Sequence, residues 1–202
     1  MSGLETIYYM FAKPEMSIRG FVERRPVGFA FLVVFLSAIS TNVAGVLITS
    51  MNLNVAKIIL SFGLLSRLIF ILGIWIIGTA IIHLFAEWLD GEGKVSTLFT
   101  SLGFCFLPAI LSTPFVLLIQ NSGSMKLLFY LLFNLIILFW MVKLQIISVK
   151  EIYHVSSFRA VIVLSIPAVL GILGIVSLLI MAFLMAFSFT SSFFPAFPIF
   201  HR

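Results

Sequence analysis

The chain is 202 residues long; 62% of them are hydrophobic and only 9% are charged. An average soluble domain is about half apolar and about a quarter charged, so 12 Lys and Arg with 7 Asp and Glu are too few to cover a water-soluble fold of this length. The composition therefore excludes a soluble globular protein, a disordered chain and a nucleic-acid-binding domain, and it predicts an all-α, polytopic membrane helix bundle. We attribute the formal net charge of +5 to the accumulation of Lys and Arg on one side of the membrane, and not to binding of a phosphate-rich partner.

Residues 1–26 precede the first long apolar stretch, and their pattern predicts short helices that lie in the membrane interface. Apolar side chains recur at helical spacing in Leu4, Ile7, Tyr8 and Phe11. A second short helical pattern, which includes Ile18, follows Pro14. Such helices place their apolar face in the acyl boundary; the alternative is that they pack on the end of the bundle. Glu5 and Lys13 interrupt the apolar stretch, so no signal peptide is expected.

A helix that crosses the hydrocarbon core needs about 20 mostly apolar residues, and five segments meet this requirement. They cover residues about 27–50, 58–86, 97–119, 127–149 and 160–187, and short connections join them. Residues 188–202 form a Phe- and Pro-rich C-terminal tail, a composition suited to the interface. Pro108 and Pro114 must interrupt the third span, because each removes an N–H donor and clashes with the preceding turn.

The orientation of the spans follows from the side on which Lys and Arg accumulate. With a cytoplasmic N-terminus, eight of these cations flank the spans on the inner side: Lys13, Arg19, Arg24, Arg25, Lys94, Lys143, Lys150 and Arg159. Three lie outside: Lys57, Lys126 and Arg202. All 7 acidic residues also fall inside, so a rule based on net charge would point the other way. Because Lys and Arg decide, we expect a cytoplasmic N-terminus and an external C-terminus.

Three ionisable residues, His83, Glu87 and Asp90, follow one another at i, i+4 and i+7, which places them on one face of a helix. Such a face can hold a divalent metal or form a proton relay. The alternative is a span that ends in water, with Asp90 in a solvated turn. No second cluster of His or carboxylates completes a coordination shell, and the H-E-x-x-H pattern of zinc proteases is missing. We therefore expect no metal and no other cofactor.

Arg67 is the most conspicuous charge inside an apolar run. It either contacts a ligand or a lipid headgroup inside the bundle, or snorkels to the outer surface from a span that begins near Leu68. Lys143 has the same two interpretations at the inner end of the fourth span.

Polar side chains recur inside the spans at Ser37, Ser40, Thr41, Asn42, Ser101, Ser112, Thr113 and Asn134. They either hydrogen-bond between helices or line a polar substrate path.

Enzymatic catalysis is not expected. Hydrolysis by a nucleophile needs a base and an orienting acid within reach, but His83, His154 and His201 lie at span ends or at the C-terminus, and no acid lies within a span. No Gly-rich phosphate loop of the Walker type is present either.

Several elements taken together resemble the Yip family of integral membrane proteins, the Ypt/Rab-interacting proteins and their prokaryotic relatives. The stretch 83–93 is similar to the family's turn after the second span. The stretch 100–108 is similar to its G-[YF]-x-x-x-P element, with Gly103, Phe104 and Pro108 in the matching places. Matching features further on are Trp140, Lys150 with Glu151, Val155 with Ser156, Arg159 with Ala160, and Pro167. The resemblance implies five spans and a cytoplasmic N-terminus.

The chain departs from the eukaryotic members of that family in two ways. Their long cytoplasmic N-terminal region is missing, and so is their D-L-Y-G-P motif. Both departures argue against binding of a Rab-type GTPase, and they point to the short prokaryotic type in the plasma membrane.

The sequence is compatible with two functions. The first is a non-enzymatic membrane organiser that assembles with copies of itself or recruits other membrane proteins; its small-residue stripe, Gly171, Gly174 and Ser177, favours close helix approach. The second is a small transporter, channel or lipid-handling protein that uses the Pro-broken third helix, because transporters build sites at broken helices.

Overall fold

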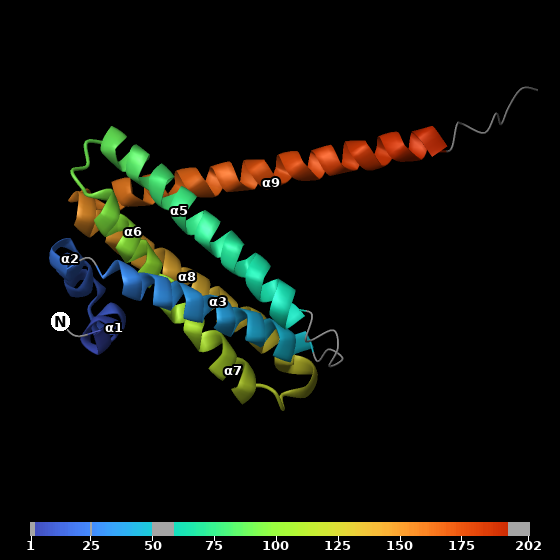
Figure 1. Ribbon diagram of the computed structural model, residues 1–202, viewed down its shortest axis with the longest axis horizontal. Coiled ribbons are helices and arrows are strands. Elements are labelled where there is room, and N and C mark those ends of the chain that lie inside the picture. The colour runs from blue at the N-terminus through green and yellow to red at the C-terminus, as the bar shows by residue number, and fades with distance from the viewer. Residues whose placement is uncertain (1–2, 25, 50–58, 194–202) are drawn as a thin grey trace, which may run out of the picture. The chain divides into compact units, whose positions relative to one another are not determined.

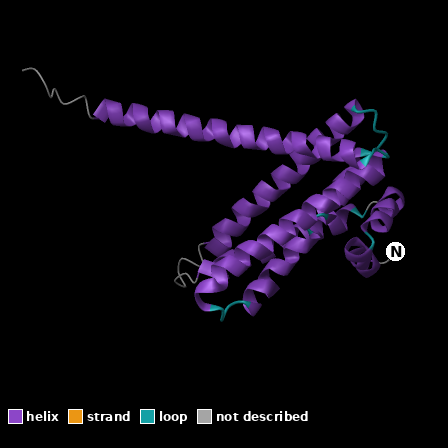
Figure 2. Cartoon of the chain, turned by 180° about the vertical axis from the view of Figure 1, so that it is seen from behind, coloured by secondary structure: helices purple, strands orange, loops and turns teal. Residues whose placement is uncertain are grey.

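Figure 1 shows the computed structural model, which describes residues 3–24, 26–49 and 59–193. These residues form helices joined by turns, with no strand among them (Figure 2). The predicted all-α fold is therefore confirmed. The chain divides into two compact units, residues 1–164 and 165–202, and each is described by itself.

The first unit begins with two short helices, α1 (Gly3–Ala12) and α2 (Pro14–Arg24). The first span is α3 (Val27–Thr49), and the second is a π-helical turn, η1 (Ile59–Gly63), continued by α5 (Leu64–Trp88). The third span is broken into α6 (Val95–Phe104), η2 (Leu107–Leu111) and α7 (Ser112–Leu118). A short turn, η3 (Gly123–Met125), leads into α8 (Lys126–Tyr153), and α9 (Ser157–Phe193) continues into the second unit.

Five helical segments are long and apolar enough to cross a membrane, which confirms the predicted number. Their bounds differ from the predicted ones by a few residues, and residues 50 and 58 of the predicted spans lie outside the described part of the chain. The largest difference is at the C-terminus, where residues 188–193 were expected in the tail but belong to α9. No Pro or Gly interrupts the helix there before Pro195. Residues 194–202 of the predicted tail lie outside the described residues.

Many apolar side chains of the spans face outward. Phe70, Leu118 and Phe139 are 67%, 82% and 67% exposed, and in the second unit every described side chain from 168 to 189 is exposed. Apolar surface on this scale leads to association or aggregation in water, whereas acyl chains solvate it without penalty. The exposed faces are therefore those of helices that lie in lipid.

The core of the first unit forms where α3 meets α5 and α6. Trp75 of α5 stacks on Phe99 of α6 with ring centroids 4.0 Å apart, and its Nε1–H donates to the Phe99 carbonyl at 2.9 Å. Gly103 lies one turn further along α6, where a Cβ would be 2.6 Å from Trp75 Cζ2 and 2.9 Å from the Ala30 Cβ of α3. A residue without a side chain is required at this point for the three helices to approach.

The break in the third span is stabilised by one serine of α3. Because Pro114 has no N–H, the carbonyl of Ile110, four residues earlier, loses its helical donor. Ser40 Oγ donates to that carbonyl at 2.7 Å and accepts the Thr113 N–H at 3.0 Å. Thr113 Oγ1 in turn donates to the Ser40 carbonyl at 2.6 Å. These hydrogen bonds join α3 to the broken helix.

Replacing Gly103 with Ala is expected to lower the Tm of the detergent-solubilised protein, since overpacking of a well-packed core costs about 1–3 kcal/mol. The matched control is Gly78→Ala on α5, where a Cβ would meet nothing within 4 Å. Ala favours a helix over Gly, so the Gly78 variant should melt at the same temperature or higher. Circular dichroism on heating measures both, and equal Tm values for the two variants would contradict the close approach.

Replacing Ser40 with Ala should destabilise the bundle, because the Ile110 carbonyl and the Thr113 N–H then lack their interhelical partner. Such hydrogen bonds in membrane proteins contribute about 0.6–1.7 kcal/mol each. The control is Ser177→Ala on α9, whose Oγ donates to the Gly174 carbonyl of its own helix at 2.8 Å. Unfolding in mixed micelles by added dodecyl sulfate gives the free energies of unfolding. A loss of the same size in both variants would show that Ser40 does not support the break.

Candidate functional site

Charged residues gather at the end of the first unit where α5 and α8 end and α6 begins, and α1 and α2 lie at this end (Figure 1). We call this surface the polar end and define it as α1, α2, the turn 89–94 and residues 150–156. Together with the last turn of α5, it brings together the carboxylates of Glu15, Glu87, Asp90, Glu92 and Glu151.

The apolar face of α2 packs on protein. Ile18 is 0% exposed, and Phe21 is 3% exposed and stacks on Phe104 of α6 with ring centroids 4.7 Å apart. α2 contacts α8 and α6, and α1 contacts α2. Of the two interpretations of residues 1–26, packing on the bundle end describes α2 better than immersion of its apolar face in acyl chains.

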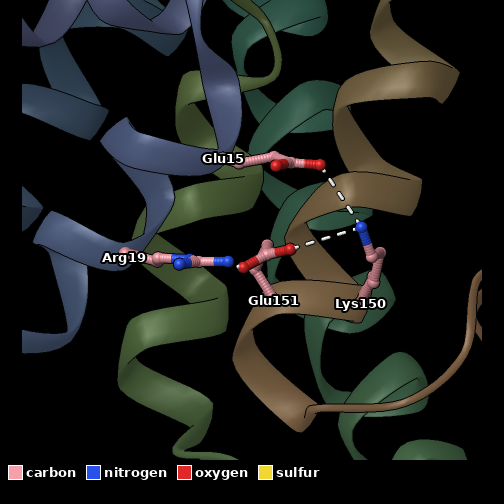
Figure 3. A network of polar contacts seen from close by, with 4 residues as sticks. All are labelled: Glu15, Arg19, Lys150 and Glu151. Carbon is pink, nitrogen blue, oxygen red and sulfur yellow. Dashed lines mark hydrogen bonds and ion pairs between the residues drawn. The ribbon is translucent and has the colours of Figure 1, made fainter.

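An ion-pair network joins α2 to the last turns of α8 (Figure 3). Arg19 Nε donates to Glu151 Oε2 at 2.7 Å. Lys150 Nζ lies 3.3 Å from Glu15 Oε1 and 3.4 Å from Glu151 Oε1. The hydrogen bond and the charge of Glu151 raise the pKa of Arg19 above its ordinary value, because both stabilise the charged guanidinium. The alternating charges hold α2 on the bundle at two points, one helical turn apart.

His83 is held between two partners. Its Nδ1 lies 2.6 Å from the hydroxyl of Tyr153, and its Nε2 lies 3.3 Å from Glu87 Oε1. A neutral imidazole that accepts the Tyr153 hydroxyl proton at Nδ1 and donates from Nε2 to Glu87 satisfies both contacts. His83 and Glu87 thus lie on one helix face and are in contact, and Tyr153 of α8 is a partner of His83 that the sequence pattern did not indicate.

Asp90 does not share the face of His83 and Glu87. Its φ of 59° is left-handed, the Asp90 N–H donates to the Glu87 carbonyl at 3.0 Å, and the Gly91 N–H donates to the Ala86 carbonyl at 2.9 Å. This is the hydrogen-bond pattern of a Schellman motif, which ends a helix with a residue in the left-handed region. Within the part of the chain that the structure describes, no group of three or more His, Cys, Asp or Glu side chains is placed to hold a metal ion.

Tyr153 also fixes the turn after α5. A Cβ at Gly93 would lie 2.6 Å from Tyr153 Cδ1, and one at Gly91 would lie 3.1 Å from the Tyr153 Cβ and 2.7 Å from the Ala86 carbonyl oxygen. The turn therefore passes directly over the buried Tyr153 ring, which is 2% exposed. This contact explains why Gly occupies both positions.

The remaining predicted residues lie elsewhere. Arg67 is exposed in the first turn of α5, at the end remote from Trp88. Lys143 is exposed on α8. Arg159 is exposed near the start of α9, and its N–H donates to Ser156 Oγ at 3.3 Å.

Only some of the polar groups inside the spans pair between helices: Ser37, Thr41 and Asn134 donate to carbonyls of their own helices, whereas Ser40, Ser101 and Thr113 bond other helices. Ser101 Oγ donates to Ser148 Oγ at 2.8 Å, which joins α6 to α8. Pro108 is buried, and Ser40 bonds both sides of the break at Pro114. Two buried oxygens near the break, Asn42 Oδ1 and Ser112 Oγ, have no hydrogen-bond partner among the described residues.

Sequence reasoning did not identify Glu15, Arg19 or Glu151 as a cluster. Glu15 and Arg19 stand at i and i+4 on α2, and Lys150 is next to Glu151, but each pair alone is an ordinary surface feature. The contact between Arg19 and Glu151 spans 132 positions, and a single sequence carries no signal for such a pairing.

The chain was compared with protein families, with curated proteins and with solved structures. The family model described as the Yip1 domain matches residues 8–179. No curated protein and no solved structure gives a significant match. The matched segment includes the second half of α1, all of α2 to α8 and the larger part of α9. The chain is therefore an integral membrane protein that belongs to the Yip1 domain family.

Proposed function

We propose that this chain is a non-enzymatic organiser of a prokaryotic plasma membrane, and that it assembles with other membrane proteins or with copies of itself. In this proposal the polar end faces the cytoplasm and is the surface at which a partner is recruited. The observation that carries the proposal is the attachment of α2 to the bundle by Arg19, Glu151, Lys150 and Glu15. A short helix that is fixed to the bundle in this way presents one defined surface to a partner, whereas a free amphipathic segment would not.

The outward side of these helices supports recruitment of protein. Tyr8 of α1 is 66% exposed and Met16 of α2 is 52% exposed. Aromatic residues and Met are enriched in protein interfaces relative to the rest of the surface. The polar end therefore combines a fixed backbone, charges of both signs and exposed apolar side chains.

Two observations favour an organiser over an enzyme or a transporter. His83 is engaged on both ring nitrogens by Tyr153 and Glu87, which is an arrangement that holds a helix end together. At the broken third span, Ser40 pairs with the Ile110 carbonyl and the Thr113 N–H, two backbone groups that the break would otherwise leave free. Binding of a GTPase forms no part of this proposal.

The orientation is tested by labelling from either side of the membrane. In a Cys105→Ser background, which removes the buried thiol, Glu92→Cys places a thiol in the exposed turn after α5 and Asn121→Cys places one in the exposed turn before α8. We expect a membrane-impermeant maleimide to label position 121 in intact cells and position 92 only in inverted vesicles. Labelling of both from one side would contradict the five-span model, and the reverse pattern would place the polar end outside.

Recruitment is tested by photo-crosslinking in native membranes. A crosslinking amino acid in place of Met16 should give discrete protein adducts, whereas one in place of Phe139, which is 67% exposed in the middle of α8, should give lipid adducts. Adding Glu151→Gln should weaken the adducts from position 16, because both Arg19 and Lys150 lose an anionic partner. The matched control is Asp90→Asn, which removes an exposed carboxylate that belongs to none of the ion pairs above and keeps a residue that tolerates the left-handed φ of this position. Absence of adducts from position 16, together with a monomer in detergent, would refute the proposal.

A further inference from the structure

A cavity of about 500 Å³ opens at the polar end, between the last turn of α5, the turn 91–94, the start of α6 and the end of α8. Its size is within the range of about 300–1,000 Å³ that small-ligand sites occupy. Trp88, 78% exposed, ends α5 beside it, and an exposed Trp at the end of a span is typical of the headgroup region. The cavity therefore lies at the level where lipid headgroups meet the protein.

One side of the cavity presents groups that bind an anion. The ten-residue helix α6 begins here, and its N-cap residue Lys94 makes no side-chain cap hydrogen bond. The Thr97 and Leu98 N–H groups donate to the Lys94 carbonyl, which leaves the first two N–H groups of the helix directed toward its N-terminal end. A helix N-terminus with such groups attracts phosphate. Lys94 and His154 line the same cavity and add a cation and a ring N–H.

Thr97 gives an independent indication of a ligand. It lines the cavity and is 1% exposed, yet its Oγ1 has no hydrogen-bond partner among the described residues. A buried hydroxyl without a partner is unfavourable because it has lost its hydrogen bonds to water, so such a group is expected to have a partner in the working protein. A phosphate oxygen at the start of α6 would accept its proton.

The other side of the cavity presents two carboxylates, those of Glu87 and Glu92. Glu87 contacts His83 through Oε1, and Glu92 belongs to no ion pair among the described residues. A purely anionic ligand would be repelled by these groups, whereas an ammonium with three N–H donors matches them. A quaternary ammonium has no N–H to donate.

We propose that this cavity binds a phosphoethanolamine headgroup, as carried by an ethanolamine phospholipid of the adjoining leaflet. The phosphate lies at the start of α6 beside Lys94 and Thr97, and the primary ammonium lies between Glu87 and Glu92. The Tyr153 ring beneath Gly91 and Gly93 holds the turn that separates the two halves. The inference rests on the cavity alone and does not require that the polar end recruits a protein.

The test uses the full chain in detergent, with an equimolar mixture of ethanolamine, choline and glycerol phospholipids of identical acyl chains, and native mass spectrometry as the readout. We expect the ethanolamine adduct to dominate. Thr97→Val and Lys94→Gln should each weaken it roughly tenfold, since a hydrogen bond to a charged group contributes about this factor. Glu92→Gln should weaken the ethanolamine adduct and strengthen the glycerol one.

The controls are Thr100→Val, whose hydroxyl donates to the Ser96 carbonyl of its own helix at 2.9 Å, and Lys143→Gln on the exposed face of α8. Both should retain the ethanolamine lipid as the unaltered protein does. Because the Thr97 hydroxyl has no partner, Thr97→Val should keep the Tm of the lipid-free protein, so a loss of lipid there is not a loss of fold.

Three results would overturn the proposal. The first is equal retention of ethanolamine and choline lipids, and the second is retention by Thr97→Val equal to that of the unaltered protein. The third concerns the source of the headgroup, because water-soluble glycerophosphoethanolamine, at the same concentration as the lipid, is expected to displace the lipid poorly. Displacement in equal measure would show that the cavity takes a free phosphate ester and not a lipid.

Discussion

In hydrocarbon, each backbone N–H and C=O group must find its partner inside the protein, and the packing of this chain depends on how that requirement is met at Pro114. Pro114 leaves the Ile110 carbonyl without its helical donor, and Ser40 of α3 supplies one. A long apolar helix has no other strong reason to choose one neighbour over lipid, because lipid solvates its side chains equally well. The break thus creates a specific polar requirement, and α3 is the helix that meets it.

The same requirement explains why α3 lies at the centre of the first unit. It contacts α5, all three segments of the third span, and α8. Small side chains permit this: Ala30 faces Gly103, and Ala38 and Ala44 are 0% exposed. Interhelical hydrogen bonds and close backbone approach are the two means by which membrane helices associate, and both act on one helix here. A Pro-broken helix in this protein is consequently an element of packing.

The sequence predicted the spans well and the polar end incompletely, for a physical reason. A span is a local property, because about 20 consecutive apolar residues are enough to define it, and α3, α5 and α8 begin or end within a few residues of the predicted bounds. The pairing of His83 with Glu87 is equally local. Asp90 does not continue that helical face because the Schellman motif ends α5 at Trp88, two residues before Asp90. The partners of Arg19 and His83 come from α8, more than 60 positions away, and no local pattern encodes them.

The last turn of α8 links the two parts of the polar end. Lys150 and Glu151 bond α2, whereas Tyr153 bonds His83 and supports the glycine turn, and His154 lines the cavity. Successive residues of one helical turn thus face the attached helix on one side and the cavity on the other. A group bound in the cavity and a protein bound on α2 would both contact this turn, and α2 also packs on α6, whose start lines the cavity. Any coupling between the two sites would be carried by these two elements, and by linkage it would be equal in both directions.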